Sequence, residues 1–291
     1  MVVQKEIVRG LLFDISLSRD VIYYAYMILL LIFIIGLVWG SGLNAFAYRF
    51  YHKKSWLRGR SFCPHCKITL TAYELIPLIS FIIQKGKCRK CKKKISYQYP
   101  LGEVATAVAF CGSFLWLTRD GATAEALFLW LMFIFSWSAW FVIFVHDFLY
   151  TLVFDSIVFS AIGVMIIMQF ARLILFEPSA VWVSHSIGYG IAFVIGAGFF
   201  AVQFVVSRGR WIGGGDIRLG LLMGITLGLP HVITALVIAY IGGSIISVAL
   251  LTLKKVQWKS EIPFGTFLAC ATLVTVLFGE PLLAWYMGLF Y

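Results

Sequence analysis

Long uncharged apolar segments dominate this sequence and restrict its fold more than any other feature. Residues 21–40 contain no charged side chain, and about 20 such residues suffice for an α-helix to cross a bilayer. Seven further apolar stretches follow, at roughly 101–117, 126–145, 156–176, 183–206, 217–229, 231–253 and 264–279. Only 13% of the residues are charged, about half the share of a soluble domain. The sequence predicts an all-α polytopic membrane protein with about eight transmembrane helices.

Two stretches differ from an ordinary span. The segment 217–229 would rise only about 20 Å as a helix, against a hydrocarbon core of about 30 Å, so we expect it to be tilted, kinked or enclosed by protein. Residues 1–20 carry several charges and lack an apolar core followed by a small-residue cleavage site. They predict an N-terminal tail rather than a cleavable signal peptide.

The positive charge is concentrated in one segment. The formal net charge is +11, but residues 49–99 alone hold 13 lysines and arginines against one acid, Glu74. This segment and the basic residues near 208–210 and 254–259 fall on one side of the membrane if eight spans alternate. The positive-inside rule makes that side cytoplasmic. The charge therefore predicts orientation in the membrane and contact with membrane lipid, and no nucleic-acid partner.

Four of the six cysteines form two Cys-x-x-Cys pairs within this basic segment. They are Cys63, Cys66, Cys88 and Cys91. Two such turns supply four thiolates for a closed tetrahedral zinc site, which leaves no position for water and therefore indicates a structural role. Two disulfides are the alternative, but a cytoplasmic segment lies in a reducing compartment, which favours the metal.

These features divide the chain into four parts. The predicted parts are an N-terminal tail (1–20), a first transmembrane helix (21–48), a cytoplasmic zinc-binding module (49–99) and a membrane core of about seven helices (100–291). Within the module, the apolar run 75–83 is too short to span a bilayer. We expect it either to lie on the membrane surface or to fill the core of the module.

Three aspartates stand at the ends of predicted spans on the same membrane face. Asp147 ends the third span, Asp155 precedes the fourth, and Asp216 precedes the sixth. If Asp147 meets Asp216, two carboxylates in a partly dry site share one proton. The ionised one draws a proton from water while the protonated one polarises a peptide carbonyl, which is aspartic-protease chemistry. The alternative is that each aspartate only caps or anchors a helix.

Glycines surround the third of these aspartates. Gly213, Gly214 and Gly215 precede Asp216 and remove side-chain bulk, so a partner helix or a substrate backbone can approach the carboxylate. Asp216 also shares one helical face with three glycines spaced four residues apart, at 220, 224 and 228. A stripe of small residues predicts tight helix packing.

Eight motifs in order resemble the type IV prepilin peptidase family of membrane aspartic peptidases. The matching segments are 40–44 with Arg49, the two Cys-x-x-Cys pairs, 74–80, 86–88, 99–103, Asp147 with Asp155, 213–216 and 262–265. The resemblance covers most of the chain, from about residue 40 to residue 269. Two positions depart from the family pattern: Phe154 stands where proline is frequent, and Arg218 where lysine is usual.

The resemblance implies a function and a set of site residues. Asp147 and Asp216 would be the catalytic pair, and the supporting residues would be Gly213, Gly215, Asp155, Asn44, Arg49, Gly86 and Glu103. Family members remove the short basic leader of prepilins and pseudopilins at the cytoplasmic face of the bacterial inner membrane. Many then methylate the new N-terminus with S-adenosylmethionine. The implied cofactors are one structural zinc ion and S-adenosylmethionine as methyl donor.

Two other functions remain open at the level of sequence. One is a presenilin-like protease that cuts within membrane spans, which the cysteine pairs and the segment 262–265 disfavour. The other is a non-enzymatic, zinc-stabilised membrane assembly factor or transporter. Transport favours polar groups near the bilayer midplane, whereas these acids cluster at span ends. The sequence gives no prediction of the oligomeric state.

Overall fold

The structure, a computed structural model, describes residues 19–55, 58–255, 257 and 262–289. These residues form eight long helices and only isolated β-bridges. The long helices are α2 (Arg19–Tyr51), α4 (Gln98–Leu117), α5 (Ala124–Tyr150), α6 (Asp155–Phe176), α7 (Trp182–Ser207), α8 (Gly214–Leu227), α9 (His231–Thr252) and α10 (Phe264–Met287). The predicted all-α fold is confirmed. The predicted tail, residues 1–20, lies almost entirely outside the described residues.

Each of the eight predicted apolar stretches forms a helix. Among the described residues, seven helices are long and apolar enough to cross a membrane, which makes this a multi-pass membrane protein. The exception is α8, which has 14 residues. The short segment recognised in the sequence is therefore a real helix, but not one that spans a bilayer by its own length.

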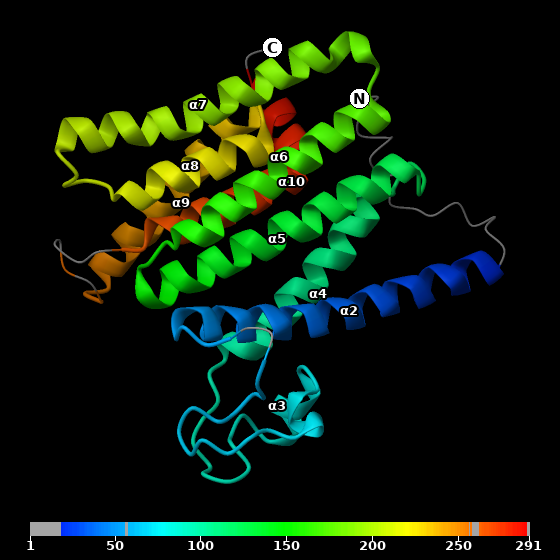
Figure 1. The fold of residues 1–291 in the computed structure, drawn as a ribbon, viewed down its shortest axis with the longest axis vertical. Coiled ribbons are helices and arrows are strands. Elements are labelled where there is room, and N and C mark those ends of the chain that lie inside the picture. Colours follow the sequence, from blue (N-terminus) through cyan, green and yellow to red (C-terminus); the bar gives the residue numbers. More distant parts are fainter. Residues whose placement is uncertain (1–18, 56–57, 256, 258–261, 290–291) are drawn as a thin grey trace.

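Helix α8 is enclosed by other helices. It packs against α6, α7 and α10 (Figure 1). Its apolar side chains Leu219, Leu222 and Met223 are fully buried. The glycine face contacts the α7 backbone so closely that a β-carbon on Gly220 would lie 2.2 Å from the Gly196 carbonyl oxygen. The stripe of small residues is thus a helix-packing surface, as predicted. Burial within protein explains how so short a helix is tolerated.

Helix α5 lies at the centre of the bundle. It contacts α2, α4, α6 and α10, and its second half is buried on most sides, including Trp140 and Ile143. This position places the last turn of α5, which carries Asp147, next to the beginnings of α8 and α10. The α5–α6 and α7–α8 connections lie at the same end of the bundle as the end of α2 (Figure 1).

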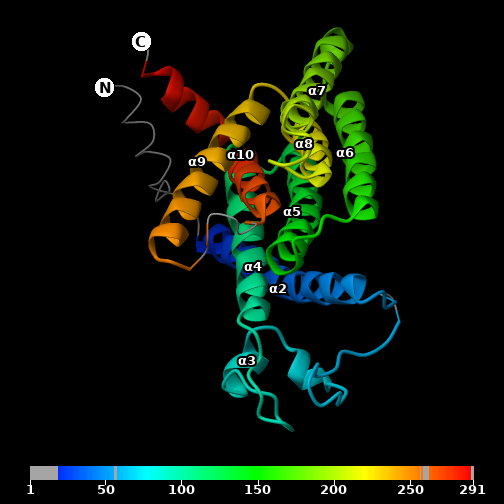
Figure 2. The same cartoon turned by 90° about the vertical axis from the view of Figure 1, so that its left-hand side faces the viewer.

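A small loop-rich module connects α2 to α4. It contains η1 (Ala72–Leu75) and α3 (Ile79–Ile83) and projects from the helix bundle in both views (Figures 1 and 2). The apolar run of this module lies on its surface: Ile79, Ile82 and Ile83 are 53%, 63% and 74% exposed. The run therefore does not fill the core of the module, and its expected location on the membrane surface stays a prediction.

Candidate active site and cysteine module

Asp147 lies in the last turn of α5 and faces the beginning of α10. Its side chain is buried, and its Oδ2 accepts a hydrogen bond from the backbone N–H of Thr266 at 2.7 Å. Thr266 is in the first turn of α10, where backbone N–H groups have no partner within the helix. The positive end of the α10 dipole thus holds the carboxylate in a fixed orientation.

Gly265 makes this contact sterically possible. A β-carbon at this position would lie 2.8 Å from Oδ2 of Asp147 and 2.9 Å from Cδ1 of Leu219. A larger residue would therefore force α10, the Asp147 carboxylate or the Leu219 side chain to shift. The segment 262–265 was recognised in the sequence only as a motif, and the structure gives its glycine a physical role.

Asp216 lies in the first turn of α8, close to Asp147. Its Oδ2 accepts a hydrogen bond from the backbone N–H of Gly213 at 3.1 Å, which satisfies one of the free donors at this helix end. The two carboxylates are close enough to interact electrostatically. The structure therefore brings together the two aspartates that the sequence placed on one membrane face.

The glycines before Asp216 allow the beginning of α8 to approach neighbouring backbone. A β-carbon on Gly215 would lie 3.2 Å from Cβ of Val153, in the connection between α5 and α6. This contact is tighter than ordinary van der Waals packing, so the absence of a side chain at Gly215 keeps α8 beside that connection. Gly213 acts through its backbone N–H alone.

Asp155 forms an ion pair with Arg218. Phe154 is the N-cap residue of α6 and Asp155 is the first helical residue, so Asp155 is not the helix cap considered in the sequence. The pair joins the first turn of α6 to the fifth residue of α8, two residues after Asp216. Arg218, noted in the sequence only as a departure from the family pattern, is the partner that the sequence did not identify.

The four paired cysteines converge in the module. Their Sγ atoms all lie within 4.8 Å of one another, with Cys63–Cys91 at 3.8 Å and Cys66–Cys88 at 3.9 Å. A tetrahedral site with metal–sulfur bonds of about 2.3 Å requires sulfur–sulfur separations of about 3.8 Å. All four are free thiols, so the disulfide alternative is not what the structure contains. The donor set fits one tetrahedral metal ion.

The two cysteine pairs sit in turns of the same construction. Lys67 donates its backbone N–H to the carbonyl of Cys63, and Lys92 donates to that of Cys88. Both lysines adopt positive φ angles of 59° and 58°. Backbone N–H groups of Cys91 and Lys90 lower the pKa of the Cys88 thiol to about 7, despite its burial. The turn thereby favours the thiolate form of Cys88, which is the form that binds a metal.

Glu74 connects two parts of the module through hydrogen bonds and an ion pair. Its carboxylate accepts hydrogen bonds from the N–H and the hydroxyl of Thr71, both at 2.9 Å, and pairs with Arg89 at 3.1 Å. The Thr71 N–H is the main reason that the pKa of Glu74 is lowered, because it stabilises the ionised form. Glu74 thus links η1 to the second cysteine turn.

A cavity of about 840 Å³ separates the module from the ends of α2 and α4. Three supporting residues named from the sequence, Arg49, Gly86 and Glu103, line it. Asn44 is buried behind it, where its side-chain amide donates to the carbonyl of Tyr99 at 3.4 Å and joins α2 to α4. The supporting residues therefore form two groups. One group is at this cavity, and the other, Gly213, Gly215 and Asp155, lies near the pair of Asp147 and Asp216.

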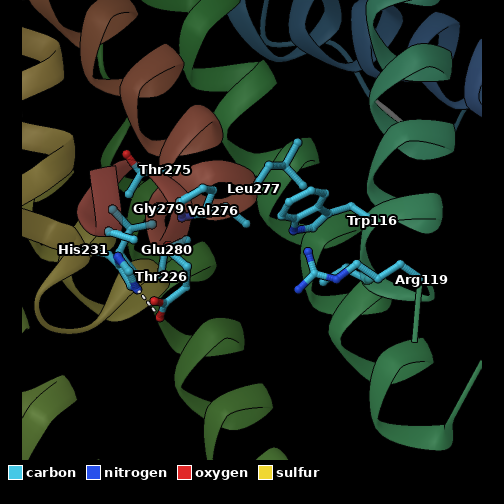
Figure 3. Close-up of a pocket in the computed structure, with 13 residues that line it drawn as sticks. Trp116, Arg119, Thr226, His231, Thr275, Val276, Leu277, Gly279 and Glu280 are labelled. Atoms are coloured by element: carbon cyan, nitrogen blue, oxygen red, sulfur yellow. Dashed lines mark hydrogen bonds and ion pairs between the residues drawn. The ribbon is translucent and has the colours of Figure 1, made fainter. Parts of the chain in front are cut away.

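A second cavity, of about 550 Å³, lies at the opposite end of the bundle (Figure 3). His231 and Glu280 line it and contact each other, with Nε2 and Oε1 3.1 Å apart. On the other side, the Arg119 guanidinium lies over the Trp116 ring at 4.4 Å. The sequence gave no indication of this cavity, because its residues come from four separate helices and their connections.

Comparisons with known proteins agree with this arrangement. The family model described as the bacterial peptidase A24 N-terminal domain matches residues 34–117, which include the cysteine module. A prepilin leader peptidase/N-methyltransferase of Bacillus subtilis is 31% identical over 257 residues, covering 88% of this chain and 97% of the relative. A protein of the same name from Legionella pneumophila is 28% identical, and the match covers 79% of this chain and 76% of the relative. Another from Pseudomonas putida is also 28% identical, and the match covers 86% of this chain and 91% of the relative. No solved structure matches. With this identity over nearly its whole length, the chain belongs to the prepilin leader peptidase/N-methyltransferase family.

Proposed function

We propose that this protein is a membrane aspartic endopeptidase that removes the short basic leader of prepilins or pseudopilins. After cleavage it methylates the new N-terminus, with S-adenosylmethionine as donor. The peptidase activity is supported by the proximity of Asp147 and Asp216 at one end of the bundle. The methyltransferase half rests on the names of the relatives. These names disfavour both a presenilin-like protease and a non-enzymatic assembly factor or transporter.

The dyad acts by sharing a proton. One carboxylate takes a proton from water, which then attacks the scissile carbonyl carbon, while the protonated carboxylate donates a hydrogen bond to the carbonyl oxygen. When the tetrahedral intermediate collapses, the C–N bond breaks and the leaving amine receives a proton. The Thr266 N–H fixes the orientation of Asp147, and Gly213 does the same for Asp216.

The location of the dyad suits a substrate with a charged leader and an apolar stem. The stem stays in lipid as a helix, while the leader and scissile bond reach the carboxylates at the end of the bundle. We assign this end to the cytoplasmic face of the bacterial inner membrane, because the basic segment 49–99 projects from it.

The four cysteines hold one structural zinc ion in this proposal. Four thiolates complete its coordination and leave no position for a catalytic water. A segment as small and polar as 49–99 cannot bury enough apolar surface to fold alone, so metal binding supplies that free energy. In this division, residues 100–291 form the peptidase core.

The peptidase half is tested by cleavage of a prepilin with a basic leader, using full-length protein purified in detergent. Asp147→Asn and Asp216→Asn should each lower the cleavage rate by at least about 10³-fold, because each removes one partner of the proton transfer. The matched control is Asp120→Asn, which changes an 89% exposed aspartate that is paired with Arg119. Near-wild-type cleavage by either dyad variant would refute the assignment.

A further inference from the structure

The cavity at the far end of the bundle from the aspartates carries side chains of both charges (Figure 3). Arg119 lines one side of it, next to Trp116, and Glu280 lines the other side, next to His231. Its volume of about 550 Å³ lies within the range of about 300–1,000 Å³ that is usual for small-molecule sites. The proposed cleavage reaction makes no use of this cavity, so its polar groups need another explanation.

The Arg119 guanidinium is held in place by contacts that leave most of its hydrogen-bond donors free. Its Nε pairs with Asp120 at 3.2 Å, and its Cζ lies over the Trp116 ring at 4.4 Å. Among the described residues, neither terminal nitrogen of the guanidinium has a hydrogen-bond partner. The pair with Asp120 is exposed and therefore weak. The free donors suit a phosphate, which a guanidinium binds through two parallel N–H groups.

Glu280 supplies the opposite charge across the cavity. Its Oε1 lies 3.1 Å from Nε2 of His231, and its side chain is 85% exposed. No lysine or arginine in the described part of the chain forms an ion pair with it. A carboxylate in this situation accepts charge-assisted hydrogen bonds from an ammonium group. The two sides of the cavity therefore suit the two ends of a zwitterion.

Two buried polar atoms in residues of the cavity wall make no hydrogen bond. Thr275 is 2% exposed, and its Oγ1 has no partner in the part of the structure that is described; the same is true of Nδ1 of His231. A β-carbon on Gly279 would lie 2.8 Å from this Nδ1, so the glycine leaves the nitrogen uncovered by a side chain. Buried polar atoms without a partner are costly, which favours an occupant with hydrogen-bonding groups.

The rest of the wall is apolar and lies where a membrane span ends. Val276, Leu277 and Ala284 of α10 line the cavity. Trp116 packs on Phe278 with ring centroids 5.9 Å apart, and these residues are 36% and 46% exposed. Tryptophan at the end of a span is typical of the level at which acyl chains meet head groups. A soluble anion gains nothing from this apolar surface, whereas a phospholipid presents both a charged head group and acyl chains.

We infer that this cavity binds the head group of a zwitterionic aminophospholipid, such as phosphatidylethanolamine, from the membrane leaflet opposite the aspartate site. The phosphate binds Arg119, the ammonium binds Glu280, and the acyl chains lie along the apolar surface beside Trp116. Glu280 selects the amine, because a glycerol head group has no cation and a choline head group has no N–H to donate. The site is separate from the aspartates, so the binding of lipid and the cleavage of prepilin are independent properties.

The experiment titrates full-length protein in detergent with dioleoylphosphatidylethanolamine and measures the lipid-bound fraction by native mass spectrometry. Arg119→Gln removes the phosphate contact and should raise the Kd at least about tenfold. Glu280→Gln should raise the Kd for this lipid by about the same factor and leave the Kd for dioleoylphosphatidylglycerol unchanged. Lys54→Gln is the matched control, because it removes a cation that also lies over a ring, 4.3 Å from that of Phe62, at the other end of the bundle. It should bind as wild type does.

Soluble probes and thermal unfolding complete the test. Inorganic phosphate and O-phosphoethanolamine should not displace the bound lipid, because they lack acyl chains to bury. All three variants should unfold at the same temperature as lipid-free wild type, which reports correct folding without reference to cleavage. Equal Kd values of wild type and Arg119→Gln for the lipid would overturn the assignment. Equal affinity of wild type for the ethanolamine and glycerol lipids would overturn it too, and displacement by inorganic phosphate would show an anion site in place of a lipid site.

Discussion

The aspartate site and the cysteine module are held together by different means. At the aspartates, helices approach through glycines: Gly265 lets α10 touch Asp147, and Gly220 lets α8 touch α7. In the module, short turns are joined by polar side chains, such as Glu74 with Arg89, and by four converging thiols.

The difference follows from the surroundings of each region. Helices surrounded by lipid gain little from burying apolar surface against each other, so close backbone packing and hydrogen bonds must stabilise them. A small module beside the membrane has water around it but too little apolar surface for a core. It therefore depends on side-chain contacts and, in the proposed function, on a metal held by the four thiols. Substitutions that affect one region and spare the other test this contrast.

Outside the two aspartates, the largest effect is expected from Gly265→Ala. The added methyl group would lie 2.8 Å from the Asp147 carboxylate, so either α10 or the carboxylate must shift. A displacement of about 1 Å at a catalytic group lowers the rate about 100-fold, and we expect cleavage to fall by about this factor. The cleavage assay with a prepilin measures it, and metal content should not change.

Gly242→Ala is the control for this prediction. A β-carbon at Gly242, in α9, would meet no atom within 4 Å. Cleavage by this variant should equal that of wild type. Equal cleavage by Gly265→Ala and Gly242→Ala would show that the close approach of α10 to Asp147 has no importance for the reaction.

The next largest effect is expected from removal of the metal ligand Cys66, and it should alter the module more than the aspartate site. Cys66→Ser replaces one of the four thiolates, and metal content measured on purified protein should fall from about one zinc per chain to little or none. Cleavage should fall by a smaller factor than in Gly265→Ala, because the hydrogen bonds that orient Asp147 and Asp216 come from Thr266 and Gly213 and not from the module.

Cys270→Ser is the matched cysteine control. Cys270 lies in α10, far in sequence from the four paired cysteines, and is not part of their cluster. Its substitution should leave the zinc content unchanged. A wild-type zinc content in Cys66→Ser would contradict the proposed coordination.

The smallest effect is expected at the ion pair of Asp155 and Arg218. Both side chains are partly exposed, and exposed pairs contribute about 0.2–1 kcal/mol. Asp155→Asn and Arg218→Gln should each slow cleavage roughly twofold to fivefold by loosening the beginning of α8. The double variant should be no slower than the single variants, since they remove the same interaction. Additive losses would show that the two residues act separately.

Much of the fold could be predicted from the sequence because membrane spans are defined by length and apolarity. All eight predicted stretches form helices, and the convergence of the four cysteines also followed from their spacing. Their spacing is sufficient because each pair lies within one tight turn. The supporting residues were harder to interpret: Glu103 was named as a single candidate, but its position in a cavity could not be anticipated.

The sequence by itself determined the membrane class, the order of helices and the shared end for Asp147 and Asp216. It did so because charge and apolarity along the chain fix where helices cross a bilayer. Only the tertiary structure placed Thr266 against Asp147, 119 residues away, and paired Asp155 with Arg218. When a helix is apolar on every side, its sequence does not indicate which face packs against the other helices. The rotation of each helix, and with it the side chains that meet, is decided by the packing of the whole bundle.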